Sequence, residues 1–341
     1  MKKPVSIKDV ARAAGVAPST VSRALHRHPR IGKETASRIR HLADELGYSP
    51  SLPARSLVTR DTTTIGLVIT YPSDPFLGRL VQGVEDAALG NGYSVFLISS
   101  HRDANREERV FKSLYERRVT GIVVTGSQID AGYLELRERF PVPVVLINCP
   151  DYPFSVSADN RAGACEAAGH LLDLGHRRIA YVANPYSYGT NLDRFTGFKM
   201  VLAERGIPLD EGLMVEGDGT LEGGARAGQQ LLALSQPPTA VLCFNDMTAM
   251  GVIHAFSCAK REVPRTCSVI GFDDLELAAY YCPPLTTVRQ PTYRLGQGAM
   301  HMMLQLIQSG SALQSELLPA KLVVRETTGL APVLASGGEG R

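Results

Sequence analysis

The sequence predicts a small three-helix domain followed by an α/β body of two lobes, each built on a doubly wound parallel sheet. Residues 5–46 carry apolar side chains at helical spacing in three short blocks separated by turn residues. From residue 64 onward, β-branched apolar runs alternate with helical stretches, and this alternation restarts after residue 160. A chain of 341 residues is also long enough for two or three domains.

The first helix is expected to begin after Ser6, whose hydroxyl can cap it. Gly15 ends the helical pattern, because glycine adopts the left-handed backbone of a tight turn without strain. A second helix is expected over about residues 17–25 and a third over 33–46, ending at Gly47. Val21 and Leu25 are expected to face inward, and the apolar residues at helical spacing in the other two helices are Ile7, Val10 and Ala11 in the first and Ile39, Leu42 and Leu46 in the third.

The stretch "YSPSLPARSLVTRDTTT" that follows is rich in Ser, Pro and Thr and is typical of a linker. We therefore expect the chain to divide as follows: the three-helix domain over 1–48, a hinge and linker over 49–62, a first lobe over 63–159 completed by 291–329, a second lobe over 160–290, and a disordered tail over 330–341.

In the body, continuous apolar strands that are each followed by a helix indicate a parallel sheet covered on both faces. The first lobe is expected to contain the strands "TIGLVIT", "YSVFLIS", "GIVVTG" and "VPVVLIN", with helices over 75–91, 104–118 and 130–140. The second is expected to contain "RIAYVAN", "LMVEG", "TAVLCFN" and "CSVIGFD", with helices over 160–174, 188–205, 221–234 and 246–261. A last helix over 292–308 and a strand over 318–324 are expected to return to the first lobe.

Charge is divided unevenly along the chain. Residues 1–60 hold 12 Lys and Arg against 4 Asp and Glu, a net +8, and the remainder holds 24 against 30, a net −6. A basic head on an acidic body indicates that the head meets a polyanion, although a basic face in contact only with solvent is the alternative.

The six cysteines are scattered, with no zinc-type spacing, which favours reduced, mostly buried thiols of a cytoplasmic protein. No signal-peptide core and no run of about 18 apolar residues occurs, so we expect a protein that is neither exported nor anchored. No cofactor and no metal are expected, and "GFDDLE" resembles a calcium loop only superficially. Without a P-loop, a GxSxG motif or metal-spaced His and Asp, an enzyme is not expected.

The helix, glycine turn and helix of "DVARAAGVAPSTVSRAL" form a helix-turn-helix pattern, whose second helix can enter the major groove of DNA. The outward residues of that helix include hydroxyls, which can address bases or phosphate, and Arg23, which can form a fork of hydrogen bonds to guanine. Three-helix units also dock proteins, but the positive charge of this one favours DNA.

Taken together, the motifs resemble the lactose/galactose-repressor (LacI/GalR) family of bacterial transcription regulators. The resemblance runs from about Val5 to Gly329 and rests on "IKDVARAAGVAPSTVSRAL", "ELGYSPSLPARSL", "TIGLVI", "DPFLGRLVQGVEDAA", "GHRRIAYVA", "RFTGF", "FNDMTAMG", "SVIGFDD" and "PPLTTVRQP". It implies a periplasmic-binding-protein-like body and a homodimer that binds a pseudo-palindromic operator in double-stranded DNA.

Residue by residue, the resemblance places Pro18, Ser19 and Arg23 at base-reading positions. It places Ser6, Thr20, Ser22 and His26 at phosphate-contacting positions. Two departures stand out: Ala17 replaces the usual Ser, which removes a helix cap that Pro18 partly compensates through its fixed φ, and His26 replaces a frequent Asn.

In the linker, the resemblance implies a short hinge helix from which Leu57 wedges into the central base step of the minor groove, with Arg55 beside it. Unstacking that step costs a few kcal/mol, which the contacts of the bent duplex offset. An ordinary apolar linker residue is the alternative for Leu57. Ser51 can cap such a helix, and Pro53 falls in its first turn, where a missing N–H does little harm.

Two similar α/β lobes form a cleft that binds a small polar ligand, the effector, at the carboxyl ends of the strands. Asp273 ends the strand "CSVIGF", and Arg194 can supply a fork of donors. The resemblance implies that both bind the effector. Asn245 and Asp246 follow the strand "AVLCF", and Asn245 is the expected effector contact of the two. In the first lobe, Asp74, Phe76, Arg102 and Asn148 match cleft-facing positions of the family. The alternatives are a cap on residues 275–280 for Asp273, a task that suits Asp274 better, and a surface ion pair for Arg194.

The effector is expected to be a sugar or a sugar derivative, because a paired Asp and Arg with neutral amides suit a polyol. Many family members stack a ring on an aromatic residue where this chain has Gly219, and the chain has no Trp. Tyr71, Phe76, Tyr186 and Tyr188 are the candidate replacements. A purine is less expected, because purine-responsive members have a cation near the position of Tyr188.

The helices expected over 75–91 and 246–261 match the family's dimer surfaces, and no leucine heptad supports a tetramer. Closure of the cleft on the effector would separate the two 51–57 segments and weaken operator binding. The alternatives are a co-repressor, control by a phosphorylated carrier protein, or a solute-binding protein. The last is disfavoured by the basic head and the missing signal peptide.

Overall fold

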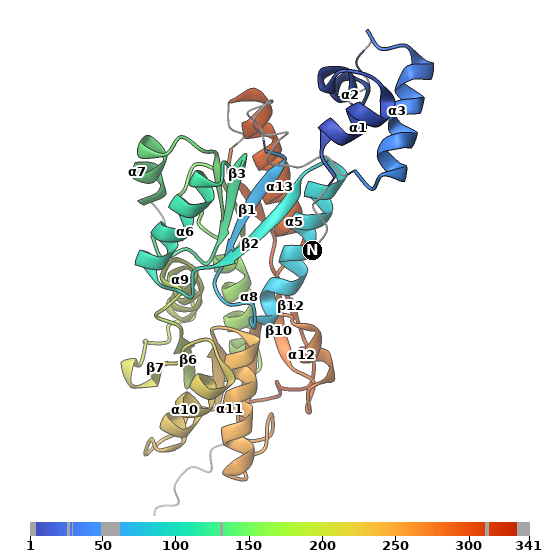
Figure 1. The fold of residues 1–341 in the computed structure, drawn as a ribbon. Helices are drawn as coiled ribbons and strands as arrows, with labels where there is room; N and C mark the ends of the chain where they lie inside the picture. The colour runs from blue at the N-terminus through green and yellow to red at the C-terminus, as the bar shows by residue number, and fades with distance from the viewer. Residues whose placement is uncertain are drawn as a thin grey trace, which may run out of the picture. The chain divides into compact units, whose positions relative to one another are not determined.

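The computed structural model describes residues 5–25, 28, 30–48, 62–129, 132–310 and 314–332, except for the side chain of Tyr188. It divides into two compact units, Met1–Thr62 and Thr63–Arg341. Figure 1 shows the helices of the first unit and the two sheets of the second. Among the described residues, no helix combines the length and apolar character needed to span a membrane.

Among its described residues, the first unit contains three helices, as predicted: α1 (Ile7–Ala14), α2 (Pro18–Leu25) and α3 (Lys33–Glu45). They enclose a small core of Val10, Ala11, Ala14, Val21, Ala24, Ala36, Ile39 and Ala43. Gly15 has the left-handed φ of 68° expected of the turn after α1. Arg38 of α3 donates to the carbonyl of Ala14 at 3.2 Å, which ties the third helix to the end of the first.

The first lobe of the body has a six-stranded sheet in the order β11-β5-β4-β3-β1-β2, with every neighbouring pair parallel. Its strands are β1 (Thr64–Ile69), β2 (Ser94–Ser99), β3 (Gly121–Thr125), β4 (Val144–Ile147), β5 (Ser155–Ala158) and β11 (Glu316–Leu318).

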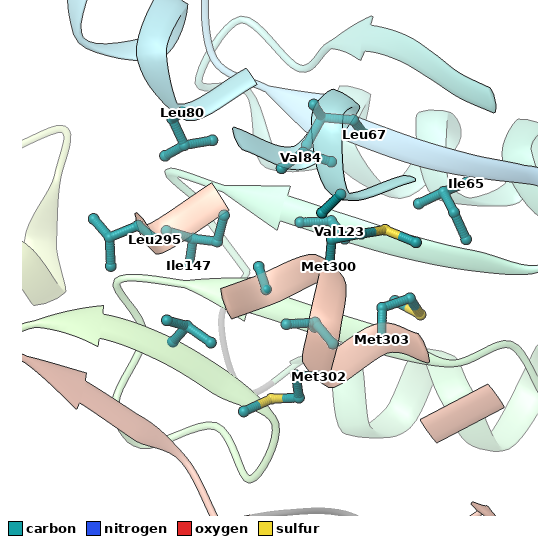
Figure 2. Close-up of a cluster of buried hydrophobic side chains, with 14 of the residues drawn as sticks. Ile65, Leu67, Leu80, Val84, Val123, Ile147, Leu295, Met300, Met302 and Met303 are labelled. Carbon is teal, nitrogen blue, oxygen red and sulfur yellow. The ribbon is translucent and has the colours of Figure 1, made fainter. Parts of the chain in front are cut away.

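Helices cover both faces of this sheet, because alternate strand residues point to opposite sides. Ile65, Leu67, Val123 and Ile147 pack under α5 (Pro75–Gly90) and α13 (Thr292–Ser309), which lie side by side (Figure 1). Figure 2 shows the methionines of α13 among these strand residues. The other face packs on α6 (Ala104–Glu116) and α7 (Gly132–Arg139).

The second lobe repeats the plan in the order β12-β10-β9-β8-β6-β7, with β12 antiparallel to β10 and the other pairs parallel. Its strands are β6 (Ile179–Ala183), β7 (Met214–Glu216), β8 (Ala240–Cys243), β9 (Ser268–Asp273), β10 (Thr286–Arg289) and β12 (Lys321–Val323). One face packs on α8 (Asn160–Asp173) and α9 (Tyr188–Glu204), and the other on α10 (Leu221–Leu232) and α11 (Asp246–Cys258). A one-turn helix, α12 (Glu276–Tyr280), follows β9.

The chain crosses between the lobes three times: from β5 to α8, from β10 to α13 and from β11 to β12. The expectation that all of 291–329 completes the first lobe is wrong for the last part of this segment. The single strand expected over 318–324 is two strands, β11 in the first sheet and β12 in the second. The pairing of β12 with β10 carries the segment after Leu318 back to the second lobe.

The prediction of mostly buried cysteines is also wrong. Cys243 and Cys267 are buried, Cys149 and Cys165 are half-buried, and Cys258 and Cys282 are exposed. The two exposed thiols occupy the last turn of α11 and the loop after α12, which the sheet does not cover.

Candidate functional site

A cavity of about 90 Å³ lies between the carboxyl ends of the two sheets. This is where the crossing connections of doubly wound lobes leave a cleft. Its lining includes all seven residues predicted for the effector site. These are Asp74, Phe76, Arg102 and Asn148 from the first lobe and Arg194, Asn245 and Asp273 from the second.

Arg194, in the second turn of α9, is 3% exposed and lies between two aromatic rings. Its guanidinium carbon is 3.7 Å from the ring centroid of Phe272 and 4.6 Å from that of Phe244. It donates to the side chain of Asn160 at 3.0 Å and to the carbonyl of Phe244. A buried cation held in this way is fixed in orientation, and a surface ion pair is ruled out for Arg194.

Asp273 ends β9 and lies 3.6 Å from Arg194, with 7% of its surface exposed. Its carboxylate accepts a hydrogen bond from Gln290 at 2.6 Å. Burial raises the pKa of Asp273 to about 7 against the opposing effect of Arg194, and Asp74 adds to the rise. The carboxyl group therefore changes charge close to neutral pH.

Neither Asp273 nor Asp274 caps α12. Leu275 is the residue at the N-cap, and its N–H donates at 2.7 Å to the buried carboxylate of Asp246. Burial and the nearby Asp273 raise the pKa of Asp246 well above its usual value. Asp274 instead forms ion pairs with Arg289 and Arg325 at 2.6 and 2.5 Å.

Asn245 caps α11, and its side-chain oxygen accepts from the N–H of Thr248 at 2.9 Å. Its amide nitrogen donates to the carbonyl of Gly219 at 3.0 Å. Gly219 has a φ of 81°, and a Cβ there would meet the amide nitrogen of Asn184 at 2.7 Å. The positive φ and this close approach together exclude a larger side chain at Gly219.

In the first lobe, Asp74 caps α5 by accepting from the N–H of Phe76 at 3.1 Å. Burial raises the pKa of Asp74, although this hydrogen bond and Arg102 act in the opposite direction. Asn148 accepts from the N–H of Ala158 at 2.9 Å, which holds the turn between β4 and β5. Arg102 extends across the cleft and donates to the carbonyl of Asp218 at 3.0 Å.

Three of the lining residues have a backbone that side chains rarely adopt. Arg102, Asn148 and Asp273 have φ values of 55°, 59° and 122°. Such conformations cost of order 1–3 kcal/mol each and persist where the surrounding structure determines them, which is frequent at binding sites. All three follow or end a strand, and all three line the cavity.

Several residues that line the cavity were not predicted from the sequence: Thr70, Leu77, Thr125, Gly126, Ser127, Ser187, Gly189, Thr190, Phe244 and Gln290. Gln290 is the most informative, because it is 4% exposed and its side-chain oxygen has no hydrogen-bond partner. Its position directly after the strand "TTVR" was the available signal. Of the candidate aromatic residues, Phe76 lines the cavity, Tyr71 and Tyr186 do not, and the side chain of Tyr188 lies outside the described residues.

On the helical unit, the predicted base-reading residues Pro18, Ser19 and Arg23 are exposed on α2. Val21 and Ala24 on the same helix are buried, so α2 presents these three residues away from its core. Thr20 and Ser22 are half-buried beside them. His26, Arg55 and Leu57 lie outside the described residues.

Ser6 stands at the N-cap of α1, as predicted, and its hydroxyl donates to Asp9 at 2.6 Å. The backbone N–H of Ser6 donates to the same carboxylate at 3.0 Å. A phosphate contact by this hydroxyl would therefore compete with Asp9.

Comparison with known proteins gives two family matches. Residues 6–51 match the model of bacterial regulatory proteins of the lacI family, and residues 168–328 match the periplasmic binding protein-like domain. The chain is 34% identical over 307 residues to the HTH-type transcriptional repressor PurR of Photobacterium profundum, covering 89% of this chain and 92% of that protein. The chain belongs to the lacI family.

Another relative of this lacI-family protein is the ribose operon repressor of Escherichia coli (strain K12), 35% identical over 92% of this chain and 96% of that one. Among solved structures, the lac repressor dimer bound to operator and the anti-inducer ONPF superposes with a TM-score of 0.88 at 29% identity. That alignment covers 96% of this chain and 100% of the other. The resemblance stated from the motifs is confirmed, and so are the fold class and the assignment as a transcriptional regulator.

Proposed function

We propose that this lacI-family protein is a repressor that binds a pseudo-palindromic operator as a homodimer and releases it when a small polyol binds between the lobes. The observation that carries the proposal is the cavity, which gathers charged and amide side chains from both lobes at the strand ends. A ligand that contacts both lobes binds one relative position of the lobes better than others, and this difference is what drives a response.

The DNA side of the proposal rests on the exposed face of α2 and on the basic charge of residues 1–60. Pro18, Ser19 and Arg23 would read base edges, and Ser6, Thr20, Ser22 and His26 would contact phosphates. Leu57, with Arg55, would wedge into the central base step. The lac repressor structure contains a dimer on its operator, which supports two copies on one site.

The effector side rests on the arrangement around Arg194 and Asp273. The guanidinium of Arg194 offers several N–H donors in a fixed orientation, and the carboxylate of Asp273 beside it accepts hydrogen bonds. Together the two groups can bind two neighbouring hydroxyls of one sugar. Asn245, Asn148, Asp74 and Gln290 offer further polar groups, and Phe76 offers an apolar face. One relative is named a ribose operon repressor, which supports a sugar as the ligand class.

We propose no catalytic role for this cavity. Within the part of the chain that the structure describes, no group of three or more His, Cys, Asp and Glu side chains is arranged to hold a metal ion. The relatives are transcriptional repressors, and a protein that acts on chromosomal operators would act in the cytoplasm.

The first test is fluorescence anisotropy of the purified protein on palindromic duplexes with a central CG step, taken from DNA flanking its own gene. Binding that prefers the palindrome over a scrambled duplex by a hundredfold or more, and that weakens steeply with salt, is expected of a specific dimer. Sugars are then added to the complex, and release by one of them is expected. Equal binding to both duplexes at every sugar concentration contradicts the operator proposal, whereas tighter binding on adding a sugar identifies a co-repressor.

A further inference from the structure

Two hydrogen bonds join the lobes beside the cavity. The guanidinium of Arg102 donates to the carbonyl of Asp218 at 3.0 Å, and the side-chain amide of Gln128 donates to the carbonyl of Tyr186 at 3.1 Å. Arg102 and Gln128 belong to the first lobe, and their acceptors belong to the second. We call Arg102 and Gln128 the struts.

The acceptor carbonyls are firmly held on the second lobe. The carboxylate of Asp218 accepts from the N–H of Thr220 at 2.9 Å and pairs with Arg226 at 2.6 Å. Asn184 accepts from the N–H of Tyr186 at 3.1 Å, which fixes the turn before α9. Each strut therefore meets backbone that is itself fastened to its lobe.

The struts are equally well supported on the first lobe. Gln128 stands on a loop that the buried Glu107 holds, since this carboxylate accepts from the N–H of Gln128 at 2.9 Å and from the hydroxyl of Ser127 at 2.7 Å. The guanidinium of Arg102 lies 5.7 Å from the ring centroid of Tyr71, which stacks on His101 at 5.2 Å. Because both ends of each hydrogen bond are fastened, widening the cleft beyond what these two hydrogen bonds can stretch requires breaking them.

With both struts in place, the cavity has a volume of about 90 Å³. An apolar cavity of roughly 150 Å³ admits benzene, so this site has room for little more than part of one small ring. Beside Gly219 the cavity wall is close, because a Cβ there would lie 2.7 Å from the side-chain nitrogen of Asn184 and in van der Waals contact with the Arg102 guanidinium at 3.6 Å. A sugar ring can enter with a small widening, whereas a second ring attached to it requires the struts to separate from their acceptors.

We propose that Arg102 and Gln128 determine the size of the effector: they restrict the cleft to a free monosaccharide and exclude the same sugar carrying a further ring. This size rule rests on the proposed sugar effector. It assigns Arg102 a role in joining the lobes, in addition to lining the cavity.

The test compares matched ligand pairs by isothermal titration calorimetry on the full chain. The pairs are D-ribose with uridine, D-glucose with cellobiose and D-galactose with lactose, in which the second ligand is the first sugar plus one ring. For every sugar that binds, the wild type is expected to prefer the free monosaccharide at least tenfold. The Arg102→Ala/Gln128→Ala variant is expected to reduce this preference below threefold.

A wild type that binds the larger ligand as tightly, or a preference unchanged in the variant, overturns the size rule alone. A panel in which no ligand binds overturns the sugar effector and the size rule with it. Arg109→Ala/Gln230→Ala is the matched control, because both residues are exposed on helices away from the cleft, and it is expected to keep the wild-type preference.

Small-angle X-ray scattering tests the struts without any sugar. The Arg102→Ala/Gln128→Ala variant is expected to have a larger radius of gyration than the wild type, because the lobes are free to separate. The control variant is expected to match the wild type. Identical scattering from all three proteins would show that the two hydrogen bonds do not hold the cleft, and would overturn the proposal.

Discussion

The guanidinium of Arg194 and the carboxylate of Asp273 lie 3.6 Å apart, with 4% and 7% of their side-chain surfaces exposed. Burial works against the charge on both groups: it lowers the pKa of Arg194 and raises that of Asp273, while each partner opposes the effect on the other. Arg194 stays charged, and a ligand that hydrogen-bonds to the carboxylate form of Asp273 would stabilise that form.

Effector affinity is expected to depend on pH through Asp273. The pKa of this carboxyl is raised to about 7, so it is mostly protonated at pH 6 and mostly ionised at pH 8. If sugar hydroxyls donate to the carboxylate, affinity at pH 6 should be about tenfold lower than at pH 8. Calorimetric titrations at several pH values measure this slope. Asp273→Asn should remove it, and an identical slope in that variant would exclude Asp273 as its source.

Replacing Arg194 by Lys should abolish the effector response while leaving operator binding intact. Lysine keeps the charge, but it cannot reproduce the fork that reaches Asn160, the Phe244 carbonyl and Asp273. Anisotropy on the operator duplex, with and without the releasing sugar, measures both properties. Full release by the same sugar concentration would remove Arg194 from the effector site. Arg289→Lys serves as a control, because Arg289 is exposed.

The two proposed modes of DNA contact should respond differently to mutation. Arg23→Ala should cost about 1–3 kcal/mol of operator affinity, with a matching loss of discrimination at one base pair. Leu57→Ala should weaken specific binding far more than nonspecific binding, because the wedge acts only when the duplex bends. Competition assays with operator and scrambled DNA measure both. Equal loss on the two duplexes for Leu57→Ala would contradict the wedge.

Two glycines of α5 offer a matched test of its packing on α13. A Cβ at Gly83 would lie 2.2 Å from the carbonyl of Tyr293, so Gly83→Ala should destabilise the body by about 1–3 kcal/mol. Gly78 has no atom within 4 Å of such a Cβ, and Gly78→Ala should stabilise by about 0.4–1 kcal/mol. Urea unfolding of the three proteins measures the difference. Similar effects of both substitutions would contradict the close approach of the helices.

The buried His176 should make stability fall in mild acid. Its ring contacts the hydroxyls of Thr239 and Ser268 at 3.0 and 2.9 Å, and burial lowers its pKa below the usual 6.5. The unfolded chain then binds more protons than the folded one, so this contribution is present above pH 6.5 and lost below it. The raised pKa values of Asp246 and Asp273 act in the opposite direction, so the test is a difference between proteins: from pH 7.5 to 5.5, the stability of His176→Gln in urea unfolding should rise relative to that of the wild type. His301→Gln, at an exposed position, should follow the wild type.

The helical and strand periodicity predicted nearly all of the fold, because most elements carry a continuous apolar run or face. The elements it missed lack that signal: β5 is "SVSA" and β10 is "TTVR", in which buried Ser and Thr replace apolar residues. Their burial comes from neighbouring strands, which a local pattern does not contain. The same reason explains the wrong assignment of β12, since its place is decided by pairing with β10.

For the site, the family resemblance placed seven side chains that the structure brings to one cavity. Residues on the loops between them were harder to predict. Gln128 and Arg102 reach their acceptors only because the two lobes are held together, and no spacing in the sequence contains that information. Gln290 likewise gains its place from the crossing between β10 and α13.

The three crossings between the lobes also bear on how such a gene can change. The helical unit is one continuous stretch, Met1–Thr62, so a single recombination point can give the protein a new operator preference. The second lobe is not continuous. If only residues 160–289 were replaced by the matching segment of another gene, the new lobe would lack its own β12. The edge of β10 would then have unpaired backbone groups, and such an edge promotes aggregation. New operator preferences should therefore be acquired by exchange of the helical unit between genes. New effector preferences should be acquired mainly by point mutation within an intact body.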